Sequence, residues 1–278
     1  MLEYRWENKA GEKGMLLLND EKIVGFLSYI VSAGTNNNNA IRYCNLSSWI
    51  VDPEFRSKSM QLLSNAFKIS NCIILNLSPH ENTRPMFKAL RFETLAETEY
   101  RINPVKLNYA YILKKKKAEV LCSKLTLKNI KNTGTSNNLK QMFADHLPYE
   151  NVHFYTFNIK KSGSSNELIL AFNQKELQSS GMSEIPYKLL GKTTQAELLY
   201  SSSAKLLIDY FSEIMLAFVN KMKIRSVNVS ENFVNKTDLK LEYVTATQKD
   251  CPWFYYSETT VDSSEIHVLY TEKVLLNF

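Results

Sequence analysis

The segment that decides the fold is WIVDPEFRSKSMQLL, residues 49–63. Its opening residues Trp49–Val51 are apolar and suit a buried strand, which Asp52-Pro53 then ends. Apolar side chains next recur at helical spacing, so an amphipathic helix is expected from about Glu54 to Lys68. A strand, a sharp turn and a helix in this order are typical of an α/β fold.

Strands and helices alternate on both sides of this segment. Upstream, the strands Met15–Leu18 and Lys22–Val31 flank a polar turn, Asn19-Asp20-Glu21, as in a hairpin. The other elements expected in this half are strands Arg42–Val51, Cys72–Leu77, Phe92–Ile102 and Asn108–Leu113, and a helix over Arg84–Leu90.

The second half repeats the order of strand, long helix and short strand. A helix is expected from about Ser203 to Met222. The strands expected around it are Val152–Ile159, Glu167–Phe172, Gln195–Tyr200, Arg225–Val229, Leu241–Thr247 and Ile266–Leu276. We therefore predict a duplicated mixed α/β (α+β) fold, with domains at 1–117 and 118–278 that meet near the lysine run Lys114–Lys117.

Composition excludes several classes of protein. The chain has 278 residues, 44% of them hydrophobic, with only 8 Gly and 7 Pro, so collagen, coiled coil and wholesale disorder are excluded. Its apolar stretches are too short for a membrane span. No signal peptide is visible, and the four dispersed cysteines contain no CxxC, so free thiols and a cytoplasmic location are expected.

Charge and histidine spacing argue against two further kinds of site. The net charge of +6 is mild, and the run Lys114–Lys117 is expected to be a solvated connector rather than a nucleic-acid contact. His146 and His153 have no carboxylate or cysteine at ligand spacing, so no metal site is expected.

Three motifs together resemble the GNAT N-acetyltransferase superfamily. Residues 49–63 resemble its acyl-CoA-binding motif, in which a strand ends in a Val-x-Pro-Glu-Tyr/Phe-Arg turn followed by Gly-x-Gly and a helix. Asn82–Phe92 is similar to the family's Asn-x-x-Ala-x-x-Phe-Tyr-x-x-x-Gly-Phe segment, and Asp20–Phe26 looks like its "dgkivGf" turn. The matches cover about Met15 to Phe92, roughly a third of the chain, in the right order.

The resemblance implies a twisted mixed sheet flanked by helices and an acyltransferase activity. Acetyl-CoA or another acyl-CoA would be the donor. The acceptor would be the amine or hydroxyl of a small molecule, for which an amino sugar or an amino acid is a guess from the breadth of the family. No nucleic acid or membrane partner is implied.

Physical chemistry agrees with the site residues that the resemblance implies. The first amides of a helix and its dipole favour a pyrophosphate, and Arg56 and Lys58 add positive charge. A strand that separates from its neighbour around Trp49–Val51 would leave backbone groups for the pantetheine arm. A backbone N–H near Ile50 or Val51 would then polarise the thioester carbonyl. The implied cofactor-binding residues are Ile50, Val51, Arg56, Ser57, Lys58, Ser59, Met60, Gln61 and Asn82.

The candidate catalytic residues follow the strand Cys72–Leu77. His80 and Glu81, after the strand Cys72–Leu77, are candidates for proton transfer, and their alternative role is that of exposed loop residues. Asn82 suits a helix cap as well as a contact with the pantetheine arm.

The chain also departs from the family pattern. Ser57, Ser59 and Gln61 stand where the family has turn glycines, Phe87 stands where a tyrosine often acts as acid, and Arg91 replaces a glycine. A catalytically degenerate module that binds CoA, or acts as a scaffold or regulatory protein, therefore stays open as the alternative.

The carboxyl-terminal region is rich in aromatic residues. Such side chains either line an acceptor pocket or form a domain core. They are Tyr243, Trp253, Phe254, Tyr255 and Tyr256.

Overall fold

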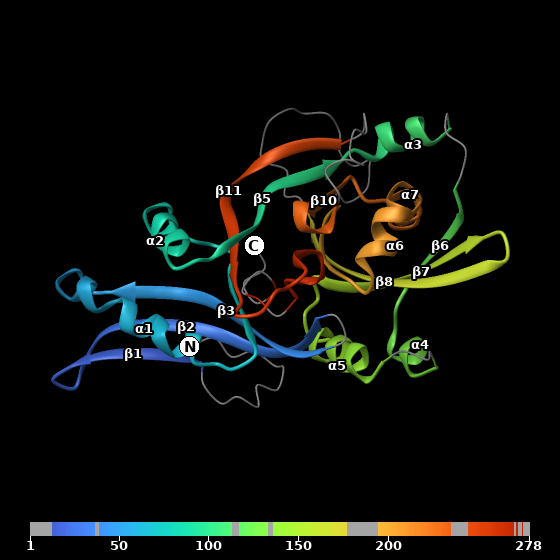
Figure 1. Ribbon diagram of the computed structural model, residues 1–278. Helices are drawn as coiled ribbons and strands as arrows, with labels where there is room; N and C mark the ends of the chain where they lie inside the picture. Colours follow the sequence, from blue (N-terminus) through green and yellow to red (C-terminus); the bar gives the residue numbers. More distant parts are fainter. Residues whose placement is uncertain are drawn as a thin grey trace. The chain divides into compact units, whose positions relative to one another are not determined.

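The computed structural model describes residues 13–36, 39–112, 117–132, 136–176, 194–234, 244–269, 271 and 274. The chain forms two compact units (Figure 1). The first unit combines Met1–Glu97 with Lys249–Phe278, and the second is Thr98–Gln248. This division differs from the predicted boundary at residue 117, because the end of the chain returns to the first unit.

The first unit is built on a mixed sheet. Its strand order is β1-β2-β3-β4-β11-β5, to which β5 and β11 each contribute part of their length. The strands are β1 (Gly14–Asn19), β2 (Lys22–Asn36), β3 (Asn39–Val51), β4 (Cys72–Asn76), β5 (Glu93–Ile102) and β11 (Val244–Tyr256). The helices are η1 (Pro53–Lys58), α1 (Met60–Phe67), η2 (Glu81–Thr83), α2 (Arg84–Ala89) and η5 (Ser263–Glu265).

The second unit is also built on a mixed sheet, of order β5-β10-β9-β8-β7-β6. Its further strands are β6 (Glu119–Lys124), β7 (Val152–Lys161), β8 (Ser164–Glu176), β9 (Thr194–Ser201) and β10 (Ser226–Ser230). Its helices are α3 (Pro104–Ile112), α4 (Leu127–Asn132), α5 (Asn137–His146), α6 (Ala204–Asp209), α7 (Phe211–Met222) and η4 (Glu231–Phe233).

The two units share one order of strand pairing. In the first, β1, β2 and β3 are antiparallel, a helical connection follows, and β4 lies parallel to β3. In the second, β7, β8 and β9 are antiparallel, α6 and α7 follow, and β10 lies parallel to β9. Each short parallel strand then takes an antiparallel neighbour from the other half of the sequence: β4 pairs with β11, and β10 pairs with β5.

Apolar burial holds each sheet to its helices. In the first unit α1 contributes Leu62, Leu63 and Ala66, and α2 contributes Phe87, to one core beneath β2, β3 and β4. In the second unit the helix α7 covers the sheet, and its Phe218 stacks on Phe172 of β8 with ring centroids 4.0 Å apart. Burial of a large apolar side chain of this kind contributes about 2 kcal/mol to the free energy of folding.

The mixed α/β class predicted from the sequence is confirmed, but four elements differ from the prediction. The expected helix over Glu54–Lys68 is a 3₁₀ helix, η1, followed by α1. Of the expected strand Asn108–Leu113, the described residues 108–112 are instead helical within α3, because Asn103 Oδ1 accepts from the amides of Val105 and Lys106 at 3.0 and 3.2 Å and Pro104 suits a first helical position.

The other two differences lie in the second half of the sequence. The helix expected over Ser203–Met222 is divided into α6 and α7 by Tyr210, whose backbone (φ −123°, ψ 25°) leaves the helical region. In Ile266–Leu276 the described residues form no strand, although Ile266, Val268 and Leu269 are fully buried. These residues are therefore apolar because they are buried, although they do not belong to a strand.

The remaining expectations concern the cysteines, the aromatic residues and the membrane. All four cysteines are free thiols. Trp253, Phe254 and Tyr255 are buried in β11, which places them in a core, whereas Tyr243 lies outside the described residues. Among the described residues, none of the helices has the length and apolar character needed to cross a bilayer.

His153 on β7 makes the stability of the protein depend on pH. Burial, aided by the charge of Lys124, lowers the pKa of His153 from 6.5 to about 4. Below pH 6.5 the unfolded chain therefore binds a proton that the folded chain does not, and stability falls as the pH drops toward 4. We expect His153→Gln to flatten this part of the pH profile, as measured by urea unfolding.

Lys124→Gln provides the comparison, because it removes the second cause and leaves the burial of His153 unchanged. The pH dependence should then become smaller without disappearing. An H153Q chain with the wild-type slope between pH 6.5 and 4 would contradict the assignment.

Candidate functional site

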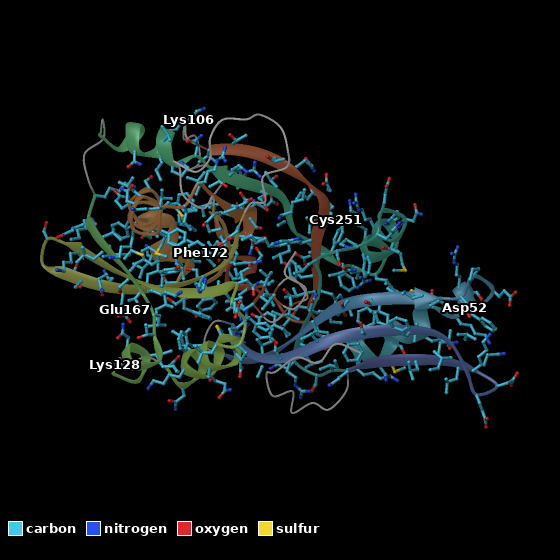
Figure 2. The ribbon with its side chains drawn as sticks, turned by 180° about the vertical axis from the view of Figure 1, so that it is seen from behind. Asp52, Lys106, Lys128, Glu167, Phe172 and Cys251 are labelled. Carbon is cyan, nitrogen blue, oxygen red and sulfur yellow. The ribbon has the colours of Figure 1, made fainter. Side chains whose placement is uncertain are left out.

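The hydrogen-bonded ladder between β3 and β4 ends half-way along β3. Their parallel ladder runs from Arg42 paired with Cys72 to Leu46 paired with Asn76, where β4 ends. Beyond Leu46 the strand β3 continues to Val51 with β2 as its ladder partner. Within the described part of the chain, the last residues of β3 therefore have one paired edge and one open edge. Figure 2 labels Asp52, which follows this stretch directly.

A β-bulge sets which backbone groups reach the open edge. Opposite Ser28 of β2, the strand β3 has two residues, Ser47 and Ser48, because the register shifts between the pairs Tyr29–Leu46 and Leu27–Trp49. The Ser48 amide donates to Ser28 Oγ at 3.1 Å. The bulge thus turns the backbone of residue 48 toward β2.

Alternation then assigns the remaining groups of β3. The amide of Asp52 donates to the carbonyl oxygen of Val24 in β2 at 2.8 Å. Since successive residues of a strand face opposite edges, Ile50 also faces β2, where it pairs with Phe26. The N–H and C=O groups of Trp49 and Val51 face the open edge. Of the two predicted donors to a thioester, Val51 has the required direction and Ile50 does not.

Side-chain packing fixes this stretch of β3 against α2. Trp49 meets Phe87 edge to face, with ring centroids 6.1 Å apart. Phe87 is 1% exposed and contacts Phe92 and Phe254 at centroid distances of 5.0 and 6.2 Å. The residue at the position of the family's tyrosine is therefore a core residue here, and its burial holds the open strand in place.

The turn after β3 is more helical than the motif suggests. Ser59 joins η1 to α1 in right-handed helical backbone (φ −57°, ψ −33°), and its amide donates to the carbonyl oxygen of Arg56 at 3.1 Å. The Ser59 side chain does not cap α1, and the Leu62 amide donates to the Ser59 carbonyl oxygen at 3.1 Å. Two amides of this turn, those of Ser59 and Leu62, are therefore already bonded within the backbone.

The predicted phosphate-binding side chains lie together on the outside of this turn. Arg56, Ser57, Lys58, Met60 and Gln61 are exposed, and Ser59 is half-buried. The Lys58 ammonium lies 5.7 Å from the centroid of the Phe55 ring, which holds its positive charge beside the turn. Because Gln61 is exposed, a change of its rotamer can clear the space that the missing glycine would have left.

His80, Glu81 and Asn82 lie at the carboxyl end of β4. His80 Nδ1 accepts from the Asn82 amide at 3.3 Å, and the His80 carbonyl oxygen accepts from the Thr83 amide at 2.9 Å. In a neutral ring this leaves the proton on Nε2. His80 thus caps η2, whereas the N-cap position of α2, the helix for which the sequence had suggested Asn82, is Thr83, whose side chain makes no cap hydrogen bond. The side chains of His80, Glu81 and Asn82 are all exposed.

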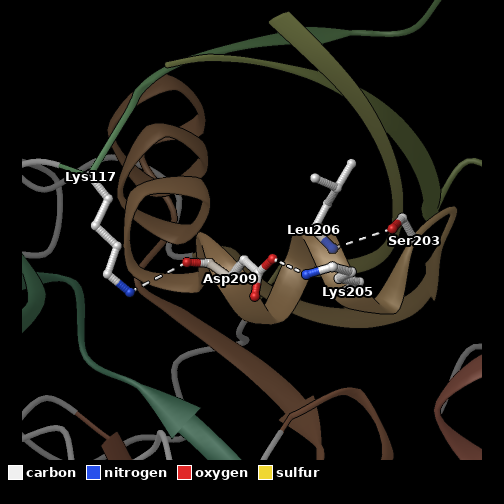
Figure 3. A network of polar contacts seen from close by, with 5 residues as sticks. All are labelled: Lys117, Ser203, Lys205, Leu206 and Asp209. Atoms are coloured by element: carbon white, nitrogen blue, oxygen red, sulfur yellow. Dashed lines mark hydrogen bonds and ion pairs between the residues drawn. The ribbon is translucent and has the colours of Figure 1, made fainter. Parts of the chain in front are cut away.

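Among its described residues, the second unit has a similar open edge, but the helix start that follows is capped by a side chain. Here β9 pairs with β10 over Gln195–Glu197 and then has its own bulge near Leu199, opposite β8. At the start of α6, however, Ser203 Oγ accepts from the Leu206 amide at 3.2 Å (Figure 3). Lys205 is paired with Asp209 at 2.8 Å. The Leu206 amide and the Lys205 ammonium, which a phosphate would need, are therefore already bonded to side chains of the second unit.

Lys117 is the one residue of the predicted lysine connector that lies within the described residues. Its amide donates to Glu213 Oε1 at 3.1 Å. Its Nζ donates to the Asp209 carbonyl oxygen at 3.4 Å, as Figure 3 shows. Lys117 thus joins the start of β6 to α6 and α7. In the described ranges, no cluster of three His, Cys, Asp or Glu residues could hold a metal ion.

Comparisons with known proteins bear on the fold. No family model and no curated protein matches the sequence. The solved structures that the chain is similar to include a GCN5-related N-acetyltransferase from Anabaena variabilis ATCC 29413, with 12% identity, 86% of this chain and 61% of that chain covered, and a TM-score of 0.49.

Two further likenesses are of the same kind. A probable N-acyltransferase from Enterococcus faecalis V583 has 10% identity over 87% of this chain and 60% of that one, with a TM-score of 0.49. Saccharomyces cerevisiae N-myristoyltransferase with bound myristoyl-CoA has 10% identity over 86% of this chain and 68% of that one, with a TM-score of 0.40. The chain spans 61% and 60% of the length of the first two of these structures.

The bulge was not predicted, although the sequence carries a signal for it. Core-facing residues of β3 fall at 44, 46, 49 and 51, and the spacing of three between Leu46 and Trp49 breaks the period of two. The pair Ser47-Ser48 fills that break. Gly25, the glycine of the Asp20–Phe26 motif, lies opposite Val51, where a Cβ would be 3.0 Å from Val51 Cγ2 and 3.1 Å from the Ile50 carbonyl oxygen.

The bulge can be tested with two serines. We expect Ser28→Ala to lower the free energy of unfolding by about 0.5–1 kcal/mol, because the Ser48 amide loses its acceptor. Ser48→Ala is the matched control, since it keeps the backbone donor, and should have no effect of that size. Equal losses for the two variants in urea unfolding would contradict the role of Ser28 Oγ.

Proposed function

We propose that the first unit binds an acyl-CoA and that the protein transfers the acyl group to an amine or hydroxyl of a small acceptor. The observation that carries this proposal is the open edge of β3 at Trp49–Val51, directly before a helix start that bears Arg56 and Lys58. An extended pantetheine arm has amide groups that can pair with such an edge. The pyrophosphate has the charge that the helix start favours.

Each part of the donor then has a place along the chain. The Val51 N–H would donate to the thioester oxygen, and amides at the start of α1, with Arg56 and Lys58, would hold the diphosphate. Ser57, Ser59, Met60 and Gln61 line the same turn, where the serine hydroxyls can donate further hydrogen bonds. In the corresponding turn of the second unit, Ser203 accepts from the Leu206 amide and Lys205 pairs with Asp209, so we assign the donor to the first unit.

The reaction is a direct displacement. The acceptor nitrogen or oxygen attacks the thioester carbonyl carbon, the C–S bond breaks, and the acyl group passes to the acceptor. The acceptor loses a proton to a base, and the CoA thiolate takes one up. His80 and Glu81, at the end of β4, are the residues we propose for these transfers, with the His80 Nε2–H as the donor group.

One observation favours a second candidate, a CoA-binding protein without catalysis. Phe87 has no proton to give and is buried among aromatic rings, so the family's usual acid is absent at that position. Acetyl-CoA as the donor and an amino sugar or amino acid as the acceptor are likewise proposals. Binding is common to both candidates, and turnover separates them.

The binding step is tested by titrating CoA and acetyl-CoA into the full chain in a calorimeter. Arg56→Ala and Lys58→Ala should each weaken binding about fivefold, because each removes one exposed charge from the phosphate turn. Lys205→Ala, in the corresponding turn of the second unit, is the control and should leave the affinity unchanged. No binding, or equal losses for all three variants, would contradict the proposal.

Turnover is then followed as release of the free CoA thiol in the presence of amine acceptors. A chain that binds acetyl-CoA in the expected way but releases no thiol above the background would favour the non-catalytic candidate.

A further inference from the structure

Strand β1 has one edge that no other described strand covers. It is the first strand in the order of the sheet, and its ladder partner among the described residues is β2. Within this part of the chain, its other edge presents backbone N–H and C=O groups. Proteins commonly protect such edges with lysine, proline or a short strand. The sequence of β1, GMLLLN, contains no charge and no proline.

An exposed apolar surface adjoins this edge. Leu16, Leu18, Ile23 and Ile50 are 58%, 57%, 55% and 58% exposed. The ladders place Leu16 beside Phe26 and Phe26 beside Ile50, and they place Leu18 beside Ile23. These side chains share one face of the sheet, opposite the face on which Leu17 is buried against α1. A contiguous apolar area across three strands is typical of an interaction surface.

We propose that the chain associates with a second copy of itself through β1, edge to edge and antiparallel. A two-fold axis perpendicular to the sheet keeps the apolar faces of both copies on the same side. Because directly opposite residues share a face, Leu16 must lie opposite Leu16 or Leu18 of the second copy. The apolar area then continues from one copy into the other.

Charge selects between these two registers. With Leu17 at the centre, Leu16 faces Leu18, and Lys13 lies beside the turn Asp20-Glu21 of the second copy. With Leu16 at the centre, Lys13 faces the uncharged Asn19. Lys13 and Glu21 are both exposed. The first register therefore places opposite charges at both ends of the paired strands, and we assign it to the dimer.

The inferred contact is short, so the dimer is expected to be weak and to depend on concentration. The test is sedimentation velocity of the full chain over a wide range of concentration, with Leu16→Lys as the disrupting variant. Leu121→Lys is the matched control, because Leu121 is 49% exposed on β6, the last strand in the order of the second unit's sheet. Wild type and L121K should form dimers, whereas L16K should remain monomeric.

Charge exchange tests the register. Lys13→Glu and Glu21→Lys should each weaken the dimer about tenfold, since two symmetry-related pairs change, and the double exchange should restore it. Singles without effect, or a double variant no better than the singles, would overturn the register. A wild-type chain that stays monomeric, or an L16K chain that dimerises like L121K, would overturn the proposal and leave the edge to another occupant.

Discussion

The constraint on which the site depends is the early end of one ladder. Strand β4 is five residues long and leaves β3 after Leu46, whereas β3 continues to Val51. A backbone group in a sheet needs a partner, and near a protein surface that partner is water or a ligand. Trp49 and Val51 therefore offer hydrogen bonds in a strand geometry that is already fixed by Phe87 and β2. Little conformational entropy is lost when a ligand pairs there.

The two units show how one strand order can serve different ends. Both have a parallel pair that separates beside a bulge. In the first, the following turn carries Arg56 and Lys58 and no side-chain cap, whereas in the second Ser203 caps α6 and Asp209 pairs with Lys205. The proposed anion site of the first unit thus differs from the start of α6 in a few side chains. That the second unit is a divergent copy of the first stays a prediction.

Most of the strands and helices of the first unit could be predicted from the sequence, and fewer of those of the second. Periodicity predicted β3, β4 and α2, and the motif around Pro53 located the turn, because these depend on local pattern and on a recognisable order of residues. The prediction of a strand where α3 lies was wrong, because Asn103-Pro104 starts a helix as readily as it ends a strand. The pairing of β11 with β4 depends on residues 178 positions apart, such as Phe254 and Asn76, and no local pattern encodes it. Among the site residues, the sequence could not show that the N–H of Val51, and not that of Ile50, faces the open edge, because this depends on the bulge.

Amide hydrogen exchange, read residue by residue by NMR in the presence and absence of CoA, tests the central claim most directly. If the pantetheine arm pairs with the open edge, exchange at the amides of Trp49 and Val51 slows on binding. The amide of Ile50, which already pairs with Phe26, changes little. Unchanged exchange at Trp49 and Val51 in a chain saturated with CoA, with protection in the second unit at Ser201–Lys205 instead, would contradict the account.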